Sequence, residues 1–218
     1  MMSSLPDPER TLASCPQVIF IVYCLGADAE GRGYAPWLRE VDMPFFNAIP
    51  GVRHYANWRL SGMLEGAPPV WDWFDFQGLS SEDVLEGVWF HPDLDEFRTN
   101  WVKLWGYGMT DPPPVLRHAY LMRQVGRRER VVPARTGVLA TGRGDPPAVD
   151  SVDLLWRVES TLHKHFTGRD PSRPWRTPSA GFNPLGFDWV CFSHGEAAVP
   201  VGATLAARTS LVAAPDQD

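Results

Sequence analysis

Residues 18–23 read Val-Ile-Phe-Ile-Val-Tyr, a run of β-branched and aromatic side chains that ends shortly before Gly26. Such a short apolar run is typical of a buried β-strand. Residues 34–45 follow, with large apolar side chains at the spacing of one helix face and Pro36 in the first turn, where a missing N–H costs nothing. The sequence therefore predicts a strand followed by a helix, which Pro44 kinks or ends.

The chain continues this alternation through the rest of its first half. Residues 52–60 and 70–76 predict two extended segments, separated by a loop rich in glycine and proline. A second helix is expected from about residue 91 to Gly106, because acidic residues lead it and a lysine closes it, as the helix dipole favours. Residues 115–125 predict a final strand. The order β-α-β-β-α-β is that of the ferredoxin-like unit, so we expect the α+β fold class.

The second half of the chain looks like a weaker copy of the first. Residues 136–141 predict a strand. A helix is expected over residues 150–168, with an apolar face made of Leu155, Val158, Leu162 and Phe166. The strand expected at residues 187–192 shares the pattern Asp-Trp-x-x-Phe with residues 72–76. Chance is an alternative for so short a match, but together with the element order it favours an internal duplication.

We therefore divide the chain into three parts. Residues 1–15 are polar and contain proline, and are expected to form a flexible leader. Residues 16–126 form the first ferredoxin-like unit, and residues 131–214 form a second, more divergent one in tandem with it.

Composition and charge exclude several classes of protein. The net charge of −6 and the pI of about 5.5 argue against broad binding to nucleic acid or to an anionic membrane. The three cysteines have no Cys-x-x-Cys spacing, so we expect neither a disulfide framework nor a zinc site. No run approaches the roughly 18 apolar residues of a membrane span, and the first residues do not have the pattern of a signal peptide. We expect a cytoplasmic protein.

Three segments of the first half resemble a known family. They are Tyr-Ala-Pro-Trp-Leu-Arg-Glu-Val-Asp-Met-Pro at residues 34–44, Ile-Pro-Gly-Val-Arg at 49–53, and Gly-Met-Leu-Glu-Gly-Ala-Pro-Pro-Val-Trp-Asp at 62–72. Together they are similar to the REDY-like, HapK-type family, and the likeness covers about residues 17–125. His-Pro-Asp-Leu-Asp-Glu-Phe at residues 91–97 resembles the second helix of the same superfamily.

The resemblance implies a dimeric α+β barrel architecture, shared with EthD-like proteins, in which the sheets of two ferredoxin-like units close one barrel. Here the second half of the chain would supply the partner sheet, an arrangement that resembles chlorite dismutase-like proteins. One departure bears on activity. EthD-like relatives often have His-x-Pro at the end of the first helix, whereas this chain has Asp42-Met43-Pro44, so a carboxylate stands in place of the imidazole.

Four residues are candidates for catalysis: His54, Asp42, Tyr34 and Tyr55. His54 and Tyr55 point to opposite faces of their strand, because side chains alternate. His54 is either a general base at a pocket wall or a hydrogen-bonded structural histidine. Asp42 is either a carboxylate base that faces the sheet or an exposed or capping residue.

A larger set of residues is predicted to bind the substrate. Asp75 lies between aromatic residues on a strand, where burial would raise the pKa of its carboxyl and allow it to shuttle protons; an exposed Asp75 would do nothing. The tryptophans either belong to a core or line a flat apolar cavity, with Trp71 and Trp73 expected on the same face. His91 is more simply a structural residue at a helix start. The full set consists of Trp37, Trp58, Trp73, Asp75, His91, Trp101 and Trp189.

These observations favour a cofactor-independent enzyme that acts on a small hydrophobic or aromatic metabolite by acid–base chemistry. The reaction would be an aldol-type cyclisation, an isomerisation or a lyase step, with no cofactor and no metal. One alternative is a cofactor-free or haem-dependent oxidoreductase of the same superfamily, although we identify no proximal histidine for haem. The other is a non-catalytic accessory protein that binds a small molecule. A homodimer is possible, and neither nucleic acid nor a membrane is an expected partner.

Overall fold

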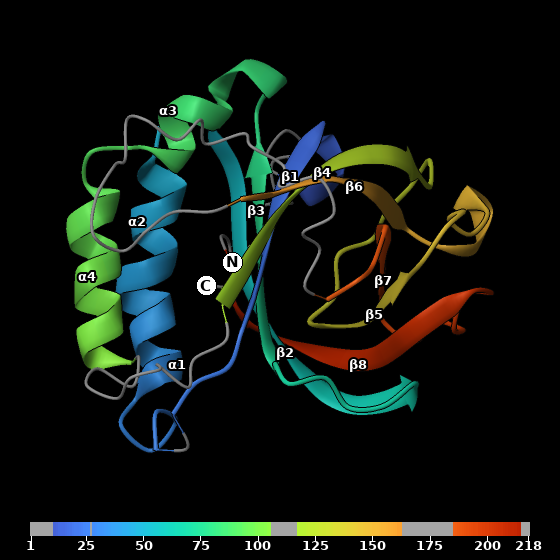
Figure 1. The fold of residues 1–218 in the computed structure, drawn as a ribbon, viewed down its shortest axis with the longest axis horizontal. Coiled ribbons are helices and arrows are strands. Elements are labelled where there is room, and N and C mark those ends of the chain that lie inside the picture. Colours follow the sequence, from blue (N-terminus) through green and yellow to red (C-terminus); the bar gives the residue numbers. More distant parts are fainter. Residues whose placement is uncertain (1–10, 27, 106–116, 163–184, 215–218) are drawn as a thin grey trace, which may run out of the picture.

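The computed structural model describes residues 11–26, 28–105, 117–162 and 185–214. Eight antiparallel strands form a closed barrel, and helices cover one side of it (Figure 1). The strands are β1 (Gln17–Tyr23), β2 (Val52–Glu65), β3 (Trp73–Leu79), β4 (Arg117–Arg127), β5 (Thr136–Gly142), β6 (Leu154–Leu162), β7 (Trp189–His194) and β8 (Ala203–Ala213). The helices are α1 (Tyr34–Trp37), α2 (Met43–Ala48), α3 (Leu85–Trp89) and α4 (Leu94–Leu104). A π-helical turn, Leu38–Asp42, joins α1 to α2, and short 3₁₀ turns span Leu12–Ser14, Glu82–Val84 and Val149–Ser151.

The strands follow the order β1-β3-β2-β8-β5-β7-β6-β4 around the barrel, and β4 pairs with β1 to close it. In the first half, the order across the sheet is β4-β1-β3-β2. In the second half it is β8-β5-β7-β6, which is the same order when the strands of that half are counted from its own start. The halves meet where β2 pairs with β8 and where β4 pairs with β6. Every strand therefore has two neighbours, and the barrel has no free edge.

Aromatic side chains fill the interior of the barrel. Alternate residues of β1, β3, β6 and β7 point inward, as the two-residue period of a strand requires. The largest of these buried side chains are Phe20, Phe74, Phe76, Trp156 and Phe192. The interior is thus a packed core of the kind that small barrels have.

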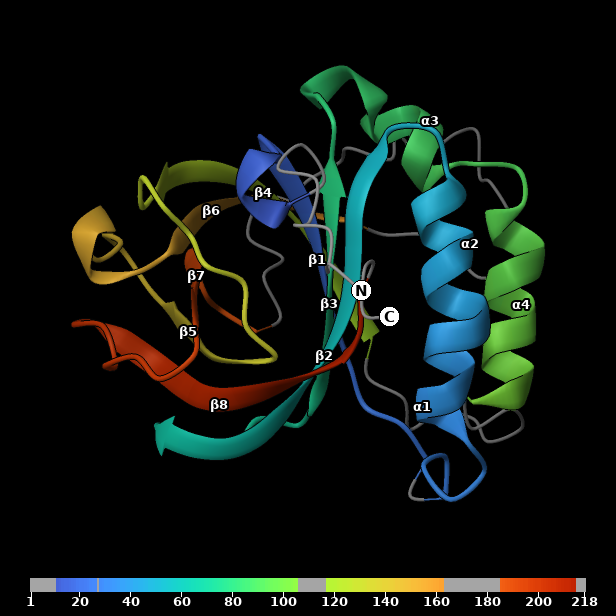
Figure 2. The same cartoon turned by 180° about the vertical axis from the view of Figure 1, so that it is seen from behind.

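The outer face of β1, β2 and β3 packs against the helices. Tyr23, Tyr55 and Trp73 project from this face, and Leu38 and Trp101 meet them from the helix side. Figure 2 shows α2 and α4 side by side against this part of the sheet. In the described part of the second half, connecting segments pack beside the strands: Val149 and Val199 lie against Trp189, Cys191 and neighbouring apolar residues of the outer face.

The helix predicted at residues 150–168 is wrong, because residues 154–162 form β6. Leu154, Trp156 and Val158 point into the barrel while Leu155 points outward, so the apolar residues follow a strand period. The helical spacing of Leu155, Val158 and Leu162 is a coincidence within a segment that is apolar on both faces. Residues 163–168 lie outside the described part of the chain.

The expected pairing of Trp71 with Trp73 on one face is also wrong. Strand β3 begins at Trp73, so the alternation of a strand does not extend to Trp71. Trp71 contacts Phe20 and Phe74 in the barrel interior, whereas Trp73 lies on the helix-covered face.

Two further observations concern the start of the chain and membranes. Of the expected leader, residues 1–10 lie outside the described residues, and residues 12–14 form a turn that packs Leu12 and Cys15 against the barrel core. Arg127 donates a hydrogen bond to the carbonyl of Ala13 in this turn, at 2.8 Å. Within the described residues, no helix has the length and apolar character needed to cross a membrane.

Candidate functional site

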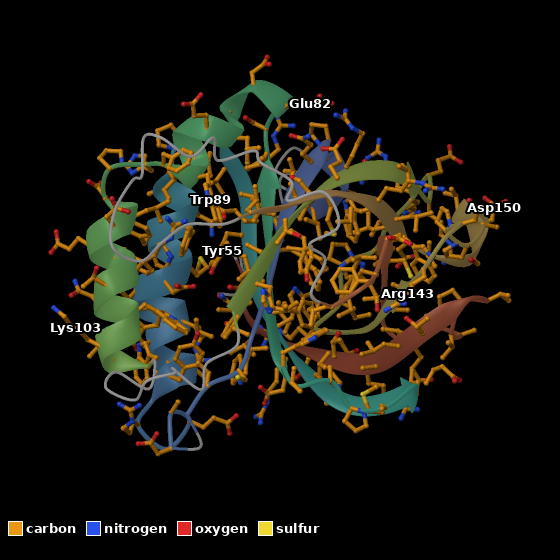
Figure 3. The ribbon with its side chains drawn as sticks, viewed as in Figure 1. Tyr55, Glu82, Trp89, Lys103, Arg143 and Asp150 are labelled. Carbon is orange, nitrogen blue, oxygen red and sulfur yellow. The ribbon has the colours of Figure 1, made fainter. Side chains whose placement is uncertain are left out.

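A small cavity lies between the helices and the outer face of the first-half sheet. Its volume is about 10 Å³, which is room for about one water molecule. Figure 3 shows Tyr55 in this layer between sheet and helices, whereas Lys103 of α4 points outward. The lining residues are Tyr23, Tyr34, Asp42, Phe46, Tyr55, Asp75, Phe97, Arg98 and Trp101.

Asp75 accepts hydrogen bonds from both neighbouring strands at the cavity. It lies on β3 and is 4% exposed. The hydroxyl of Tyr23 donates to Oδ1 at 3.1 Å, and the hydroxyl of Tyr55 donates to Oδ2 at 3.1 Å. The amide Nδ2 of Asn57 donates to Oδ1 at 2.9 Å. Strands β1 and β2 flank β3 and supply these donors, so the register of the sheet fixes the carboxylate in place.

Asn57 connects Asp75 to the second buried carboxylate of the site. Its Nδ2 also donates to Oδ2 of Asp42, at 3.0 Å, so two carboxylates approach one nitrogen atom. Asp42 is 3% exposed and Asn57 is fully buried. Removing one of these groups would leave the others buried without their partner, which is costly.

The π-helical turn places Asp42 at the cavity. The N–H of Met43 donates to the carbonyl of Leu38, five residues back, which is the hydrogen bond of a π-helix. Pro44 follows directly and has no N–H to continue the α-helical pattern, so the chain widens at this point. Turns of this kind occur often at functional sites.

Three phenols extend the hydrogen-bonded network from the carboxylates toward α4. The indole Nε1 of Trp101 donates to the hydroxyl of Tyr34 at 3.3 Å, and this hydroxyl donates to that of Tyr23 at 3.2 Å. Burial raises the pKa of Tyr23, Tyr34 and Tyr55 well above the ordinary value of 10.0, and the nearby carboxylates raise it further. The phenols therefore keep their protons at neutral pH and act as hydrogen-bond donors.

Aromatic rings and one arginine complete the walls. The ring of Phe46 stacks on that of Tyr55 with 4.3 Å between the centroids. Arg98 is 7% exposed; its guanidinium carbon lies 4.6 Å from the ring centroid of Trp89, and Nη1 donates to the Trp89 carbonyl at 3.4 Å. The guanidinium is thus held against α3 by a cation–π contact and a hydrogen bond.

The described geometry can be compared with known proteins. Residues 17–101 match the family model described as REDY-like protein HapK. This match confirms the resemblance seen in the sequence, although the likeness was expected to extend to residue 125. No curated protein and no solved structure matches the chain. Every residue that lines the cavity lies inside the REDY-like segment, and so does Asn57.

The structure brings five of the proposed site residues together within the REDY-like segment. Tyr34, Asp42, Tyr55, Asp75 and Trp101 all line the cavity. Two more, Trp37 and Trp73, lie directly behind Tyr34, with ring centroids 6.0 Å and 5.1 Å from its own.

The other four proposed residues lie elsewhere. His54 is on β2 with Ala56 and Trp58, which face the barrel interior, so it points away from the cavity as alternation predicts. Trp58 belongs to the interior core, with its ring 4.7 Å from that of Phe192. Nδ1 of His91 accepts a hydrogen bond from the N–H of Asp93 just before α4, which is a local structural contact. Trp189 is buried on the outer face of the second half.

Sequence reasoning missed several residues of the site. Asn57 could have been found, because it lies two residues after Tyr55 on β2 and so points to the same face of the strand. Tyr23 follows the same rule on β1, where Ile19 and Ile21 precede it on the outer face. Arg98 could not have been found from the sequence. In the sequence of an amphipathic helix, a buried arginine looks the same as one that faces solvent.

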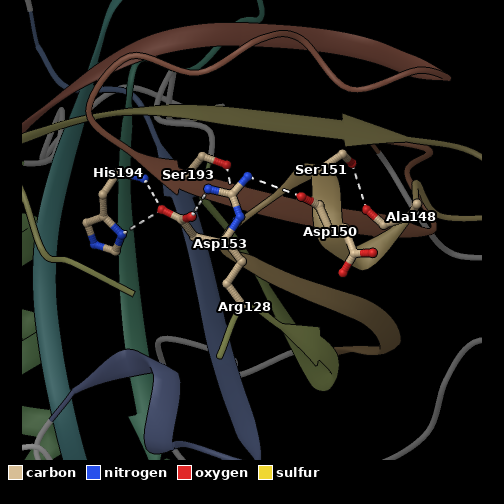
Figure 4. Close-up of polar contacts among 7 residues, drawn as sticks. All are labelled: Arg128, Ala148, Asp150, Ser151, Asp153, Ser193 and His194. Carbon is tan, nitrogen blue, oxygen red and sulfur yellow. Dashed lines mark hydrogen bonds and ion pairs between the residues drawn. The ribbon is translucent and has the colours of Figure 1, made fainter. Parts of the chain in front are cut away.

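A second cluster of polar side chains lies at the ends of β6 and β7 (Figure 4). Asp153 accepts hydrogen bonds from Nη1 of Arg128 at 3.0 Å and from the backbone N–H of His194 at 2.8 Å. The N–H of Asp153 donates to Oγ of Ser193 at 3.2 Å. Nδ1 of His194 lies 3.6 Å from Asp153, and burial lowers the pKa of this histidine below its ordinary value of 6.5. We call this cluster the β6–β7 latch.

The latch joins chain segments and does not have the arrangement of a nucleophile and its base. Ser193 and His194 are neighbours on β7, and side chains of neighbouring strand residues point to opposite faces. Nη2 of Arg128 also donates to the carbonyl of Asp150, at 3.2 Å, in the turn where Ser151 donates to the carbonyl of Ala148. The contacts therefore fix the chain after β4 to the start of β6 and the end of β7.

Proposed function

We propose that the protein is a cofactor-independent enzyme that transfers protons on a small hydrophobic or aromatic metabolite. The observation that carries the proposal is the pair of buried carboxylates, Asp42 and Asp75, held by one amide at an aromatic-lined cavity. Buried carboxylates with defined partners are costly to fold and are characteristic of functional sites. An aldol-type cyclisation, an isomerisation or a lyase step would use this chemistry.

The geometry suggests a different role for each carboxylate. Three donors from β1 and β2 hold the carboxylate of Asp75. We therefore assign Asp75 a structural role, in which its charged carboxylate orients the hydrogen-bonded network. Asp42 reaches the cavity from the helix side, and we assign it the role of general base. A positioned base contributes typically about 10²–10⁴-fold in rate. The phenols of Tyr34 and Tyr55 keep their protons and donate them to Tyr23 and to Asp75, so their role is to hold the network around the carboxylates in place.

A second proposal concerns the origin of the barrel. We propose that residues 16–126 and 131–214 are two ferredoxin-like units that arose by duplication. The shared strand order supports this, and so does a matching detail of register: Trp73 of β3 pairs with Arg59 of β2, and Trp189 of β7 pairs with Arg157 of β6. Because the chain closes its own barrel, a second copy is not needed to complete the sheet.

The experiment is the exchange of carbon-bound hydrogen with deuterium oxide, followed by mass spectrometry on aryl ketones such as phenylacetone and 4-hydroxyphenylacetone. Wild-type protein is expected to accelerate exchange next to the carbonyl. Asp42→Asn, which keeps the size of the side chain, is expected to lower the rate about 100-fold or more. Asp83→Asn, at an exposed carboxylate in the turn before α3, is the matched control and should exchange at the wild-type rate. Exchange at the buffer rate with wild-type protein across the panel would contradict the proposal.

A further inference from the structure

The hydroxyl of Tyr34 keeps one acceptor position at the cavity. A hydroxyl oxygen can donate one hydrogen bond and accept two. The hydroxyl of Tyr34 donates to Tyr23 and accepts from Nε1 of Trp101. Within the described residues, one lone pair of this oxygen therefore remains for a further donor. Tyr34 lines the cavity and is 1% exposed, so bulk solvent does not reach it and the donor has to lie in the cavity.

The size and the walls of the cavity suit one water molecule as this donor. The volume of about 10 Å³ is that of a single water. Water fills a buried cavity of this size when two to four polar groups line it, whereas an apolar cavity stays dry. Phenol oxygens and the carboxylates of Asp42 and Asp75 line this one. A water molecule has two hydrogens, one for the oxygen of Tyr34 and one for a carboxylate oxygen.

The position of this water matters because of the chain of hydrogen bonds that starts at Tyr34. The hydroxyl of Tyr34 donates to that of Tyr23, which donates to Asp75. Trp101 donates to Tyr34 from the other side, but an indole N–H has no lone pair with which to accept a proton and pass one on. A proton that moves along the chain therefore enters at Tyr34 from the cavity. Asp42 lines the same cavity and is 3% exposed.

We propose that the cavity binds one water molecule between Tyr34 and Asp42, and that this water carries protons from Asp42 to Asp75. Protonated Asp42 gives its proton to the water, and the water gives one of its own hydrogens to the oxygen of Tyr34. Tyr34 passes its hydrogen to Tyr23, and Tyr23 passes its hydrogen to Asp75. The water and both phenols end with as many hydrogens as they had at the start, so the net change is one proton moved between the carboxylates. The relay rests on the proposed function, because it returns Asp42 to the form that acts as base.

High-resolution crystal structures of the full chain test the water site directly. Wild-type protein is expected to show one water within hydrogen-bond distance of the hydroxyl of Tyr34 and of the carboxylate of Asp42. Tyr34→Phe removes the phenol acceptor and should lose this water, whereas Asp83→Asn, at an exposed carboxylate, should keep it. A dry cavity in wild-type protein, or a metal ion in place of the water, would overturn the inference. The wild-type structure decides the question if Tyr34→Phe does not fold.

The relay is tested by the release of tritium from phenylacetone labelled next to its carbonyl, measured in mixtures of water and deuterium oxide. Wild-type protein is expected to give a curved dependence of the rate on the deuterium fraction, because several exchangeable hydrogens move together. Tyr23→Phe keeps the base and the water but interrupts the chain, so release should be slower and the curvature should be lost. A merely structural role of Tyr23 would lower the rate and leave the curvature unchanged.

The outcomes separate this inference from the proposed function. A dry cavity in a protein that still exchanges the aryl ketones would overturn the water site and the relay alone. A bound water together with wild-type curvature in Tyr23→Phe would overturn the relay and would direct the proton through another hydroxyl, such as that of Tyr55, which also donates to Asp75. If wild-type protein releases no tritium, the relay fails together with the proposed function, and the crystal structure still decides the water site.

Discussion

At the scale of the single residue, Asn57 decides whether the two carboxylates of the site can coexist. Its Nδ2 is within 3.0 Å of an oxygen of Asp42 and of Asp75, and it also contacts the hydroxyl of Tyr55 at 3.2 Å. Asn57→Asp would put a third carboxylate at this buried position. We expect a loss of about 3–5 kcal/mol in the free energy of unfolding, because a donor disappears and a like charge replaces it.

Urea unfolding monitored by tryptophan fluorescence measures this loss. Asn100→Asp is the control, because Asn100 is exposed on α4 and the same chemical change there should cost less than about 0.5 kcal/mol. Equal stability of Asn57→Asp and wild-type protein would show that the carboxylates do not depend on the amide.

The residues of the site also show what could be predicted from the sequence. Asp42, Tyr34 and Tyr55 were among the predicted catalytic residues, and all three line the cavity. His54 stood out for its chemistry, yet it faces the other side of β2. Choosing between the two faces requires knowing which one the helices cover, and no pattern along β2 alone contains that information.

At the scale of the element, the β6–β7 latch predicts a pH dependence of stability. Burial lowers the pKa of His194 in the folded protein, so the unfolded chain binds the proton more readily. The folded protein holds His194 in its neutral form, so its full stability is present above about pH 6.5, the ordinary pKa of histidine in the unfolded chain. The free energy of unfolding decreases as pH falls from this value toward the lower pKa that His194 has in the folded protein. Asp153 and Arg128 are the charged groups that face the histidine in the latch; Asp153 opposes the shift without cancelling it.

Unfolding free energies at pH 7.5 and pH 5 should therefore differ more in wild-type protein than in His194→Asn. Ser151→Ala is the control within the latch: it removes the hydrogen bond to the carbonyl of Ala148 and should lower stability by about 1 kcal/mol at both pH values. An identical pH slope in wild-type protein and His194→Asn would contradict this account.

Some strands can be predicted from their own residues, whereas others depend on pairing with distant segments. Strands β1, β5 and β7 lie where the short β-branched and aromatic runs predict them, because composition alone marks a buried strand. Strand β6 was predicted as a helix, because Leu154, Leu155 and Trp156 are buried on both faces and lose the alternation that marks a half-exposed strand. Residues 154–162 form a strand because they pair with β4 and β7, and these partners lie in other parts of the sequence.

At the scale of the whole molecule, the two halves share a strand order, but within the described residues the polar network is found on the first half alone. The register aligns β7 with β3, so the position of Asp75 corresponds to Cys191. On the flanking strands, Leu155 lies opposite Cys191 as Asn57 lies opposite Asp75. Gly142 lies opposite Trp189 as Tyr23 lies opposite Trp73. An apolar set thus stands where the first half has a carboxylate, an amide and a phenol.

The packing around Gly142 strengthens this difference between the two halves. A Cβ atom on Gly142 would clash with the indole of Trp189 and lie 2.7 Å from the carbonyl oxygen of Gly202. Trp189 therefore occupies the space where a phenol would have to stand, and burial raises the pKa of the Cys191 thiol to about 12, which keeps it uncharged. Among the described residues, the second half therefore has no charged pair at the positions that correspond to Asp75 and Asn57.

A barrel built from two such halves should accordingly bind one ligand per chain. Calorimetric titration with phenylacetone is expected to give a stoichiometry of one, with no second binding event behind it. Native mass spectrometry of the same mixture gives an independent count, because it resolves chains with one and two ligands. A second bound equivalent per chain would contradict this prediction and would place a further binding site in the second half.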